Sequence, residues 1–153
     1  MKAHFNELFA YDRWANKRVY ELIRSTRPKN DRIYLLFSHI ISASRIWLNR
    51  CAGRPGIIDL FAERSMPEME IDLRENDREW QHLLDQLPDG DLLQDITYKN
   101  TQGTPFVTPL NGMMMQVINH GTHHRGQIVQ LVRQEGFDVP GTDYILYHRQ
   151  KQK

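Results

Sequence analysis

The chain of 153 residues contains a single cysteine, Cys51. One thiol cannot build an internal disulfide framework, so we expect a protein of a reducing compartment such as the cytoplasm. Cys51 stands beside Ala52 and Gly53 at the end of a predicted helix, with no second cysteine or dense motif around it. We interpret Cys51 as a plain helix-end residue and not as a nucleophile.

The sequence also lacks an excess of charge of one sign and lacks long apolar runs. Twenty Lys and Arg residues against nineteen Asp and Glu residues give a formal net charge of +1. This balance argues against DNA or RNA as the main partner, because nucleic-acid binders usually carry a basic excess. No stretch approaches the ~18 uninterrupted apolar residues of a membrane span, and the N-terminal "MKAHFNELFAYDRW" does not resemble a signal peptide. We therefore expect a soluble protein without nucleic-acid or membrane partners.

Four long helices are predicted from the spacing of apolar residues, over about residues 6–25, 31–52, 67 to just before "LPDGD", and 108–134. Asn30 or Asp31 is the expected cap of the second helix, and Gly53, Pro55 and Gly56 are its expected stop. Pro109 is expected at the first position of the fourth helix, and Gly136 after its end.

The apolar sides of these helices predict the core. They are Phe5, Leu8, Phe9, Trp14, Val19, Leu22 and Ile23 on the first helix, Leu36, Ile40, Ala43, Ile46 and Trp47 on the second, and Ile71, Leu73, Trp80, Leu83, Leu84 and Leu87 on the third. Helices of this length and number indicate an all-α four-helix bundle forming one domain over residues 1–153.

Shorter elements are expected between and after the long helices. "LLQDITYKN", a turn at "TQG" and "TPFVTP" predict a β-hairpin before the last long helix, with Gly103 able to take a positive φ. The linker "IIDLFAER" is expected to hold a short helical turn. The tail "DYILYHRQKQK" is expected to form a final turn or short helix.

The segment "INHGTHHRGQI" concentrates three histidines within the fourth helix. On a helical wheel at ~100° per residue, His120 and His124 lie on one side, at and near the edge of the apolar stripe, whereas His123 faces outward. An i, i+4 histidine pair can reach a single metal ion.

His39 is the expected third ligand, because its helical neighbours Leu35, Leu36, Ser42 and Ala43 place it at least partly inside the bundle. His4 is expected to lie in a frayed N-terminus, His82 in solvent and His148 in the tail. Three imidazoles from two helices suit Zn, Ni, Cu or Fe, and three protein ligands leave positions open, as in catalytic sites.

Residues near the histidines are candidates for supporting the rings. Asn119, Ser38, Ser42 and Gln127 are possible acceptors for the imidazole N–H groups that do not face the metal. Arg125 is expected either to hold an anionic group or to tie helices together, and the sequence leaves both readings open. Gly121 lies at the centre of the buried stripe, where we expect another backbone to come close.

These motifs together resemble those of a known family. "NHGTHHRGQI" followed by "LVRQEG", with "YDRWAN", "SHIISASRIWLNR", "TQGTPF" and "DYILYHR" in the same order, resembles the DinB/YfiT-like family of DNA-damage-inducible-type metalloenzymes, which are distinct from the polymerase that shares the DinB name. The resemblance implies a four-helix bundle, a homodimer, and a divalent metal, zinc or nickel, bound by His39, His120 and His124. Some relatives are thiol S-transferases or isomerases that use mycothiol, bacillithiol or glutathione.

The leading functional hypothesis is a metal-dependent enzyme in which a low-molecular-weight thiol attacks a small electrophilic substrate. Metal-assisted hydrolysis is an alternative, although no Asp or Glu lies within the histidine motif to act as a base. A non-catalytic metal-binding protein of a stress response is a third reading. DNA binding is the weakest, because the charge is balanced.

Overall fold

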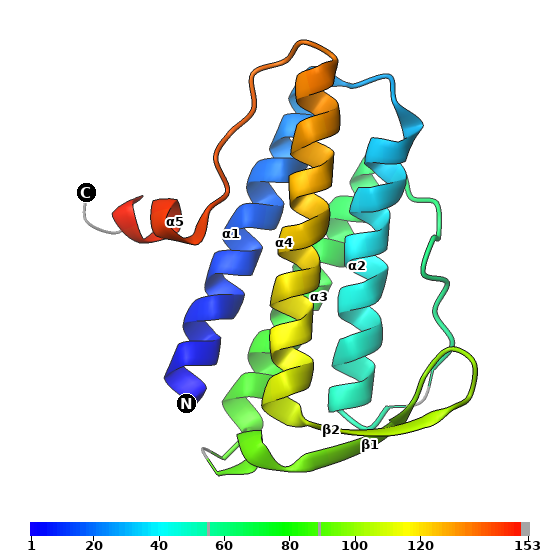
Figure 1. Ribbon diagram of the computed structural model, residues 1–153, viewed down its shortest axis with the longest axis vertical. Helices are drawn as coiled ribbons and strands as arrows, with labels where there is room; N and C mark the ends of the chain where they lie inside the picture. Colours follow the sequence, from blue (N-terminus) through cyan, green and yellow to red (C-terminus); the bar gives the residue numbers. More distant parts are fainter. Residues whose placement is uncertain (55, 89, 151–153) are drawn as a thin grey trace.

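A computed structural model describes residues 1–54, 56–88 and 90–150. The elements in chain order are α1 (Lys2–Thr26), α2 (Asp31–Cys51), α3 (Met66–Gln86), the 3-10 helix η1 (Asp91–Leu93), β1 (Asp95–Lys99), β2 (Pro105–Pro109), α4 (Leu110–Gln134) and α5 (Tyr144–Gln150). The predicted fold class is confirmed: four long helices form a bundle, and a short hairpin precedes the last of them (Figure 1). No helix in the described part of the chain has both the length and the apolarity to cross a bilayer.

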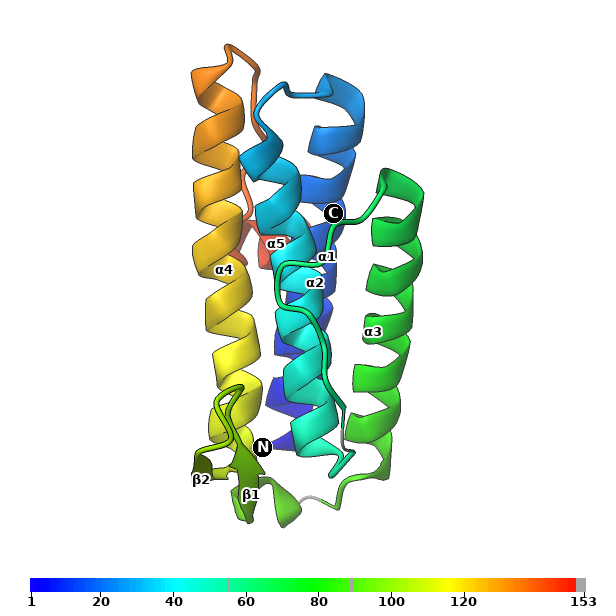
Figure 2. The ribbon, with the colours of Figure 1, turned by 90° about the vertical axis from the view of Figure 1, so that its right-hand side faces the viewer.

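The bundle has one long crossover. Within it, α2 packs on α4, α4 on α1, α1 on α3, and α3 on α2. After α2 descends to the hairpin end, the linker climbs back along the whole length of α2 before α3 begins, so α2 and α3 run in the same direction (Figure 2). The linker therefore lies against the outer side of α2 at mid-height. It contains a turn at residues 60–61 and no helical turn, unlike the prediction for "IIDLFAER".

Two helix starts differ from the predictions. Helix α1 begins at Lys2, because the Lys2 Nζ donates to the backbone oxygens of Asp85 and Leu87 at 3.0 and 2.9 Å and Phe5 is buried. His4 therefore lies inside a helix and not in a frayed end. Helix α4 begins after Pro109, which ends β2 and acts as the N-cap.

The other predicted boundaries depend on capping residues. The Asn30 side chain accepts a hydrogen bond from the Arg32 backbone N–H, as expected of an N-cap. Gly136 follows α4 with φ 89°, a conformation that favours glycine. Ser65 and Glu68 form a capping box before α3, which the sequence reading missed. The predicted stop at Pro55, Asp89 of "LPDGD" and the last three residues of the tail lie outside the described residues.

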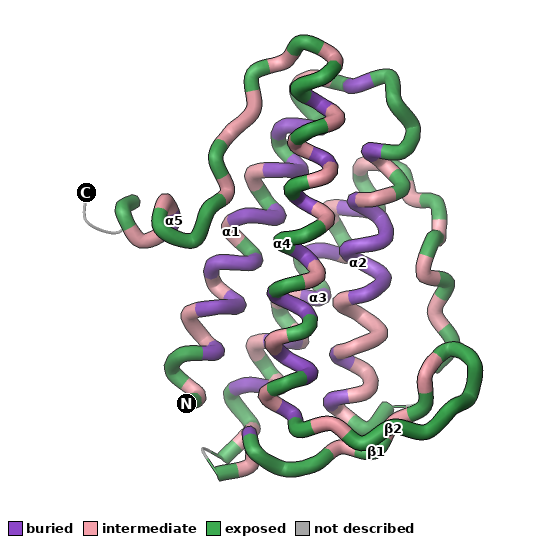
Figure 3. The backbone as a smooth tube through the Cα atoms, viewed as in Figure 1, coloured by how far each residue is buried: buried purple, intermediate pink, exposed green. Residues whose placement is uncertain are grey.

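Buried residues recur along the four long helices, whereas the hairpin has none (Figure 3). The core divides into two apolar clusters, one near the hairpin around Phe9, Trp80 and Met114, and one at the other end around Ile23, Phe37 and Val132. Buried polar residues lie at the level between them: Asp12, Asn16, Ser38, His39, Ser42, Asn76 and Arg125. Polar groups inside a bundle require partners and can form binding sites between facing helices, so this layer is the candidate position of a functional site.

One core prediction on α3 is wrong. Ile71 is 63% exposed, although we expected it on the core side. The buried residues of α3 are Met69, Leu73, Asn76, Trp80 and Leu84, which follow the 3–4 residue spacing of a single helix face. Ile71 lies two residues before Leu73, so it is turned by about 200° away from that face.

The hairpin and the tail are the two shorter parts outside the four long helices. β1 and β2 pair antiparallel from Asp95↔Pro109 to Lys99↔Pro105, and Gly103 has the predicted positive φ, at 83°. The tail forms a short helix, α5, as one of the two predicted outcomes. The chain just before α5 is held to α1 by a hydrogen bond from the Tyr11 hydroxyl to the Thr142 carbonyl at 2.9 Å.

Candidate metal centre

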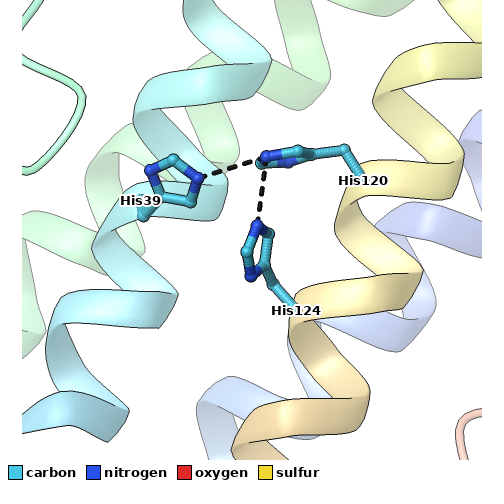
Figure 4. Close-up of side chains that lie close together, drawn as sticks. All are labelled: His39, His120 and His124. Carbon is cyan, nitrogen blue, oxygen red and sulfur yellow. Dashed lines mark hydrogen bonds between the residues drawn. The ribbon is translucent and has the colours of Figure 1, made fainter.

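Three histidines meet in the polar layer between α2 and α4. The Nε2 atom of His120 lies 3.1 Å from the Nε2 atoms of both His39 and His124. The ligand atoms of the three rings all lie within 4.8 Å of one another, and no other group of this kind occurs among the described residues. Figure 4 shows the ring of His120 reaching from α4 toward His39, with His124 one turn further along α4. The structure thus brings together the three histidines that the sequence singled out.

The spacing of the rings fits a cation. Imidazole nitrogens bind Zn²⁺ at about 2.0–2.1 Å, so two such ligands in a tetrahedral site lie roughly 3.3 Å apart. Two of the three Nε2 pairs are at 3.1 Å.

The outer nitrogens of two rings fix which nitrogen faces the site. His39 Nδ1 is 3.1 Å from the Leu60 carbonyl, which can only accept, so Nδ1 carries the proton. His124 Nδ1 is 2.7 Å from Gln127 Oε1 and donates to it in the same way. Both rings in their neutral form therefore present an unprotonated Nε2 to the centre, as metal ligands must.

Burial keeps the rings of His120 and His124 neutral. Burial, followed by the neighbouring imidazoles of His124, His39 and His123, lowers the pKa of His120 to about 4. Burial also lowers the pKa of His124, against the opposing effect of its hydrogen bond to Gln127, and His39 and His123 add a smaller lowering contribution. Near pH 7 both rings are deprotonated, so an incoming cation need not displace a proton from them.

The linker before α3 supplies contacts that the sequence reading missed. Besides the Leu60 carbonyl, Phe61 stacks on the His39 ring with centroids 4.8 Å apart and an interplanar angle of 13°. Phe61 is 62% exposed, so it forms an apolar wall open to solvent. The only sequence signal was the apolar pair "LF" within the linker "IIDLFAER", and periodicity cannot place a linker residue against a helix.

Arg64 fixes this linker to α2. Its guanidinium Nη1 donates to Ser38 Oγ at 2.6 Å and to Ser42 Oγ at 2.9 Å, while its Nε pairs with Asp72 on α3 at 2.7 Å. Ser38 Oγ also donates to the Ala62 carbonyl. The two serines, expected to contact imidazoles, therefore bind the linker and support His39 indirectly.

Arg125 contacts α1 and not the histidine group between α2 and α4. It is 1% exposed and donates to Asp12 and, at 2.7 Å, to Asn16, both on α1. Of the two readings left open by the sequence, the structure shows the one in which Arg125 ties helices together. Gly121 makes room for this ion pair: an added Cβ would lie 2.9 Å from Arg125 Nη1 and 2.9 Å from Asp12 Oδ1. The expected close approach is by side chains and not by a backbone.

Of the remaining candidate residues, Gln127 contacts the histidine rings, whereas Asn119 and Cys51 do not. Gln127 contacts His124, as already described, and its Nε2 lies 3.3 Å from the ring of His123, which is exposed as predicted. Asn119 is exposed, with no side-chain hydrogen bond within the described ranges. Burial raises the pKa of the Cys51 thiol to about 12, so this thiol stays protonated and is a poor nucleophile at neutral pH.

Comparisons with known proteins agree with this architecture. Protein DinB of Bacillus subtilis (strain 168) is 25% identical over 162 residues, covering 92% of this chain and 91% of that protein. The crystal structure of a DinB-like protein from Bacillus cereus ATCC 10987 superposes with a TM-score of 0.67 at 23% identity, over 90% of this chain and 94% of that one. At 23% identity the structural match shows a shared fold and nothing further. The sequence model of the DinB family matches residues 1–153, and the chain therefore belongs to the DinB family.

Proposed function

We propose that this protein is a metal-dependent enzyme that transfers a group to or from a low-molecular-weight thiol. The observation that carries the proposal is the convergence of three imidazole Nε2 atoms from two helices, with no carboxylate in the group formed by the described residues. His120 and His124 are only partly buried, so solvent or a small molecule can approach the centre. Three protein ligands with access from outside are typical of catalytic sites.

His39, His120 and His124 are the residues that would hold a divalent cation, with zinc or nickel as the proposed ions. A bound cation of this kind lowers the pKa of a thiol or water molecule beside it, which supplies a nucleophile near neutral pH. The Leu60 carbonyl and Gln127 keep the rings of His39 and His124 in the required tautomer. Phe61 covers one face of His39 and offers an apolar surface to a substrate.

A thiol is favoured over water as the nucleophile because the histidine group contains no Asp or Glu to act as a general base for hydrolysis. In the proposed reaction the thiol loses its proton to solvent, a sulfur–carbon bond forms, and the leaving group departs with the electron pair of the bond that breaks. We also propose a homodimer and a cytoplasmic location, the first from family membership and the second from the single buried cysteine.

The test is a turnover assay with zinc- or nickel-loaded protein, chlorodinitrobenzene as the electrophile, and glutathione, bacillithiol or mycothiol as the thiol. We expect the His124→Ala variant to lose at least about a hundredfold in rate, because removing one ligand destroys the metal site. His82→Ala is the matched control, since His82 is exposed on α3 and should leave the rate unchanged. Turnover equal in the wild type and the His124→Ala variant with every thiol would refute the proposal.

A further inference from the structure

A cavity lies at the hairpin end of the bundle, away from the histidines. It has a volume of about 620 Å³, opens to solvent, and is bordered by the last turns of α2, the start of the following linker and the hairpin. Its apolar walls come from Ile46, Ile57, Ile58 and Tyr98. Ile57 is fully exposed to solvent. A volume in the range of about 300–1,000 Å³ suits a small molecule.

The charge of this cavity is of one sign. Arg50, Arg54 and Lys99 line it, and no Asp or Glu is among its described lining residues. Arg54 is neutralised by an ion pair with Glu79 on α3. Arg50 and Lys99 form no ion pair within residues 1–54, 56–88 and 90–150. In a chain of nearly balanced charge, an uncompensated cationic concavity indicates an anionic occupant.

Arg50 is the most specific feature of the cavity. Its guanidinium carbon lies 4.7 Å from the ring centroid of Trp47 and 5.0 Å from that of Tyr98, so two aromatic rings hold its orientation. Arg50 is partly buried, so its charge is partly removed from water, and this burial lowers the pKa of its guanidinium. A guanidinium held in this way presents its N–H groups in a fixed plane, and planar carboxylates match that geometry.

Arg50 is not needed as a helix cap. The last carbonyls of α2 are already bonded to backbone amides: Leu48 O to Ala52 N at 2.9 Å, Asn49 O to Arg54 N at 2.8 Å, and Arg50 O to Gly53 N at 3.2 Å. The guanidinium donates to no acceptor in the part of the chain that the structure describes. Its favourable position at a helix C-terminus explains a positive charge there but not the apolar cavity beside it.

We propose that this cavity binds a small organic carboxylate with an apolar body, whose carboxylate pairs with Arg50 and whose body lies against Ile46, Ile57 and Tyr98. The site is separate from the histidines. His39 and Arg50 are eleven positions apart on α2, which corresponds to about 16 Å along the helix axis. The proposal therefore does not depend on a metal.

The experiment titrates phenylbutanoate into isotope-labelled protein and follows the backbone amides by NMR. We expect saturable shifts at residues 97–101 that weaken with added salt, and at least about tenfold weaker binding of the uncharged phenylbutanamide. The Arg50→Gln variant should bind phenylbutanoate at least about tenfold more weakly, and Arg50→Lys should fall between it and the wild type. Arg133→Gln is the matched control, because Arg133 is exposed on α4 outside the cavity, and it should change binding by no more than about twofold.

A folded Arg50→Gln variant is recognised by amide spectra unchanged outside the cavity. Equal binding of the acid and the amide, or wild-type affinity in that folded variant, would overturn the proposal. So would shifts that centre on His120 and disappear when EDTA is added, because the probe would then occupy the metal centre. If Arg50→Gln does not fold, the comparison of acid and amide binding to the wild-type protein decides the matter. The Arg50→Lys variant, which keeps the positive charge, then gives the second measurement.

Discussion

The ion pair between Arg125 and Asp12 is the most buried charged contact in the described bundle. Arg125 is 1% exposed and Asp12 is 7% exposed. Asn16 shares the guanidinium and also donates to Asp12 Oδ2 at 2.9 Å, and Thr122 accepts from Arg125 Nη2 at 3.0 Å. Arg125 follows His124 directly in the chain. The network therefore fixes α4 against α1 at the level where the histidines must meet α2.

Replacing Asp12 with Ala should destabilise the protein by about 3–5 kcal/mol, because it leaves a buried guanidinium without its counter-charge. Urea unfolding of the wild type and the variant measures this difference. The double variant Asp12→Leu with Arg125→Met should recover most of the loss, since it removes both charges. Lys17→Ala, at the exposed Lys17–Glu21 pair, is the control and should cost less than about 1 kcal/mol. A loss of that small size for Asp12→Ala would contradict the assigned role.

Single residues of the site were predictable where helical spacing alone decides their direction. The wheel placed His120 and His124 together and His123 outside, and the structure agrees. The partner of Arg125 was not predictable, because Asp12 is 113 positions away and nothing in the local pattern of α4 points to α1. Asn119 was chosen for its chemistry, but its direction on the helix leads to solvent.

At the scale of elements, α1 and α3 meet around a carboxyl that is costly to ionise. Asp77 on α3 is half-buried, and burial raises the pKa of its carboxyl to about 7, with Asp12 adding to the increase and Arg13 opposing it. The pKa of Asp77 is higher in the folded state than in the unfolded state. The protonated carboxyl of Asp77 therefore contributes its full stabilisation below about pH 4. This stabilisation is lost as the pH rises through about 7.

Asp77→Asn should therefore raise the melting temperature more at pH 8 than at pH 5, because the amide is neutral at both values. The melting temperatures of the variant and the wild type, compared at the two pH values, give the difference. Asp138→Asn changes an exposed carboxyl after α4 and should shift the melting temperature equally little at both. A larger gain for Asp77→Asn at pH 5 than at pH 8 would show that the sign is wrong.

The presence of the helices and strands was easier to predict than the contacts between them. The four long helices and the hairpin follow from apolar spacing and turn residues, and most boundaries lie within a few residues of the prediction. The early start of α1 was not predictable, because it depends on the contact of Lys2 with the end of α3, which is not visible in the sequence. The linker from α2 to α3 was the main gap, since its position depends on Arg64, Ser38 and Ser42 meeting in space.

At the scale of the whole molecule, the bundle places a polar layer between two apolar clusters. The histidines occupy the side of this layer between α2 and α4, and the Arg125–Asp12 pair occupies the side between α4 and α1. A cation held by His39, His120 and His124 would connect α2 to α4 through side chains from separate segments. Binding to such a site requires the assembled fold, because the unfolded chain does not bring position 39 close to position 120.

The most direct test of this account is a calorimetric titration of Zn²⁺ into metal-stripped protein and into its His39→Ala variant. We predict one ion bound per chain in the wild type and at least about a hundredfold weaker binding in the variant, because the third ligand comes from α2. His82→Ala should bind as the wild type does. Absence of binding in the wild type, or equal affinity in the wild type and the His39→Ala variant, would contradict a metal centre shared by the two helices.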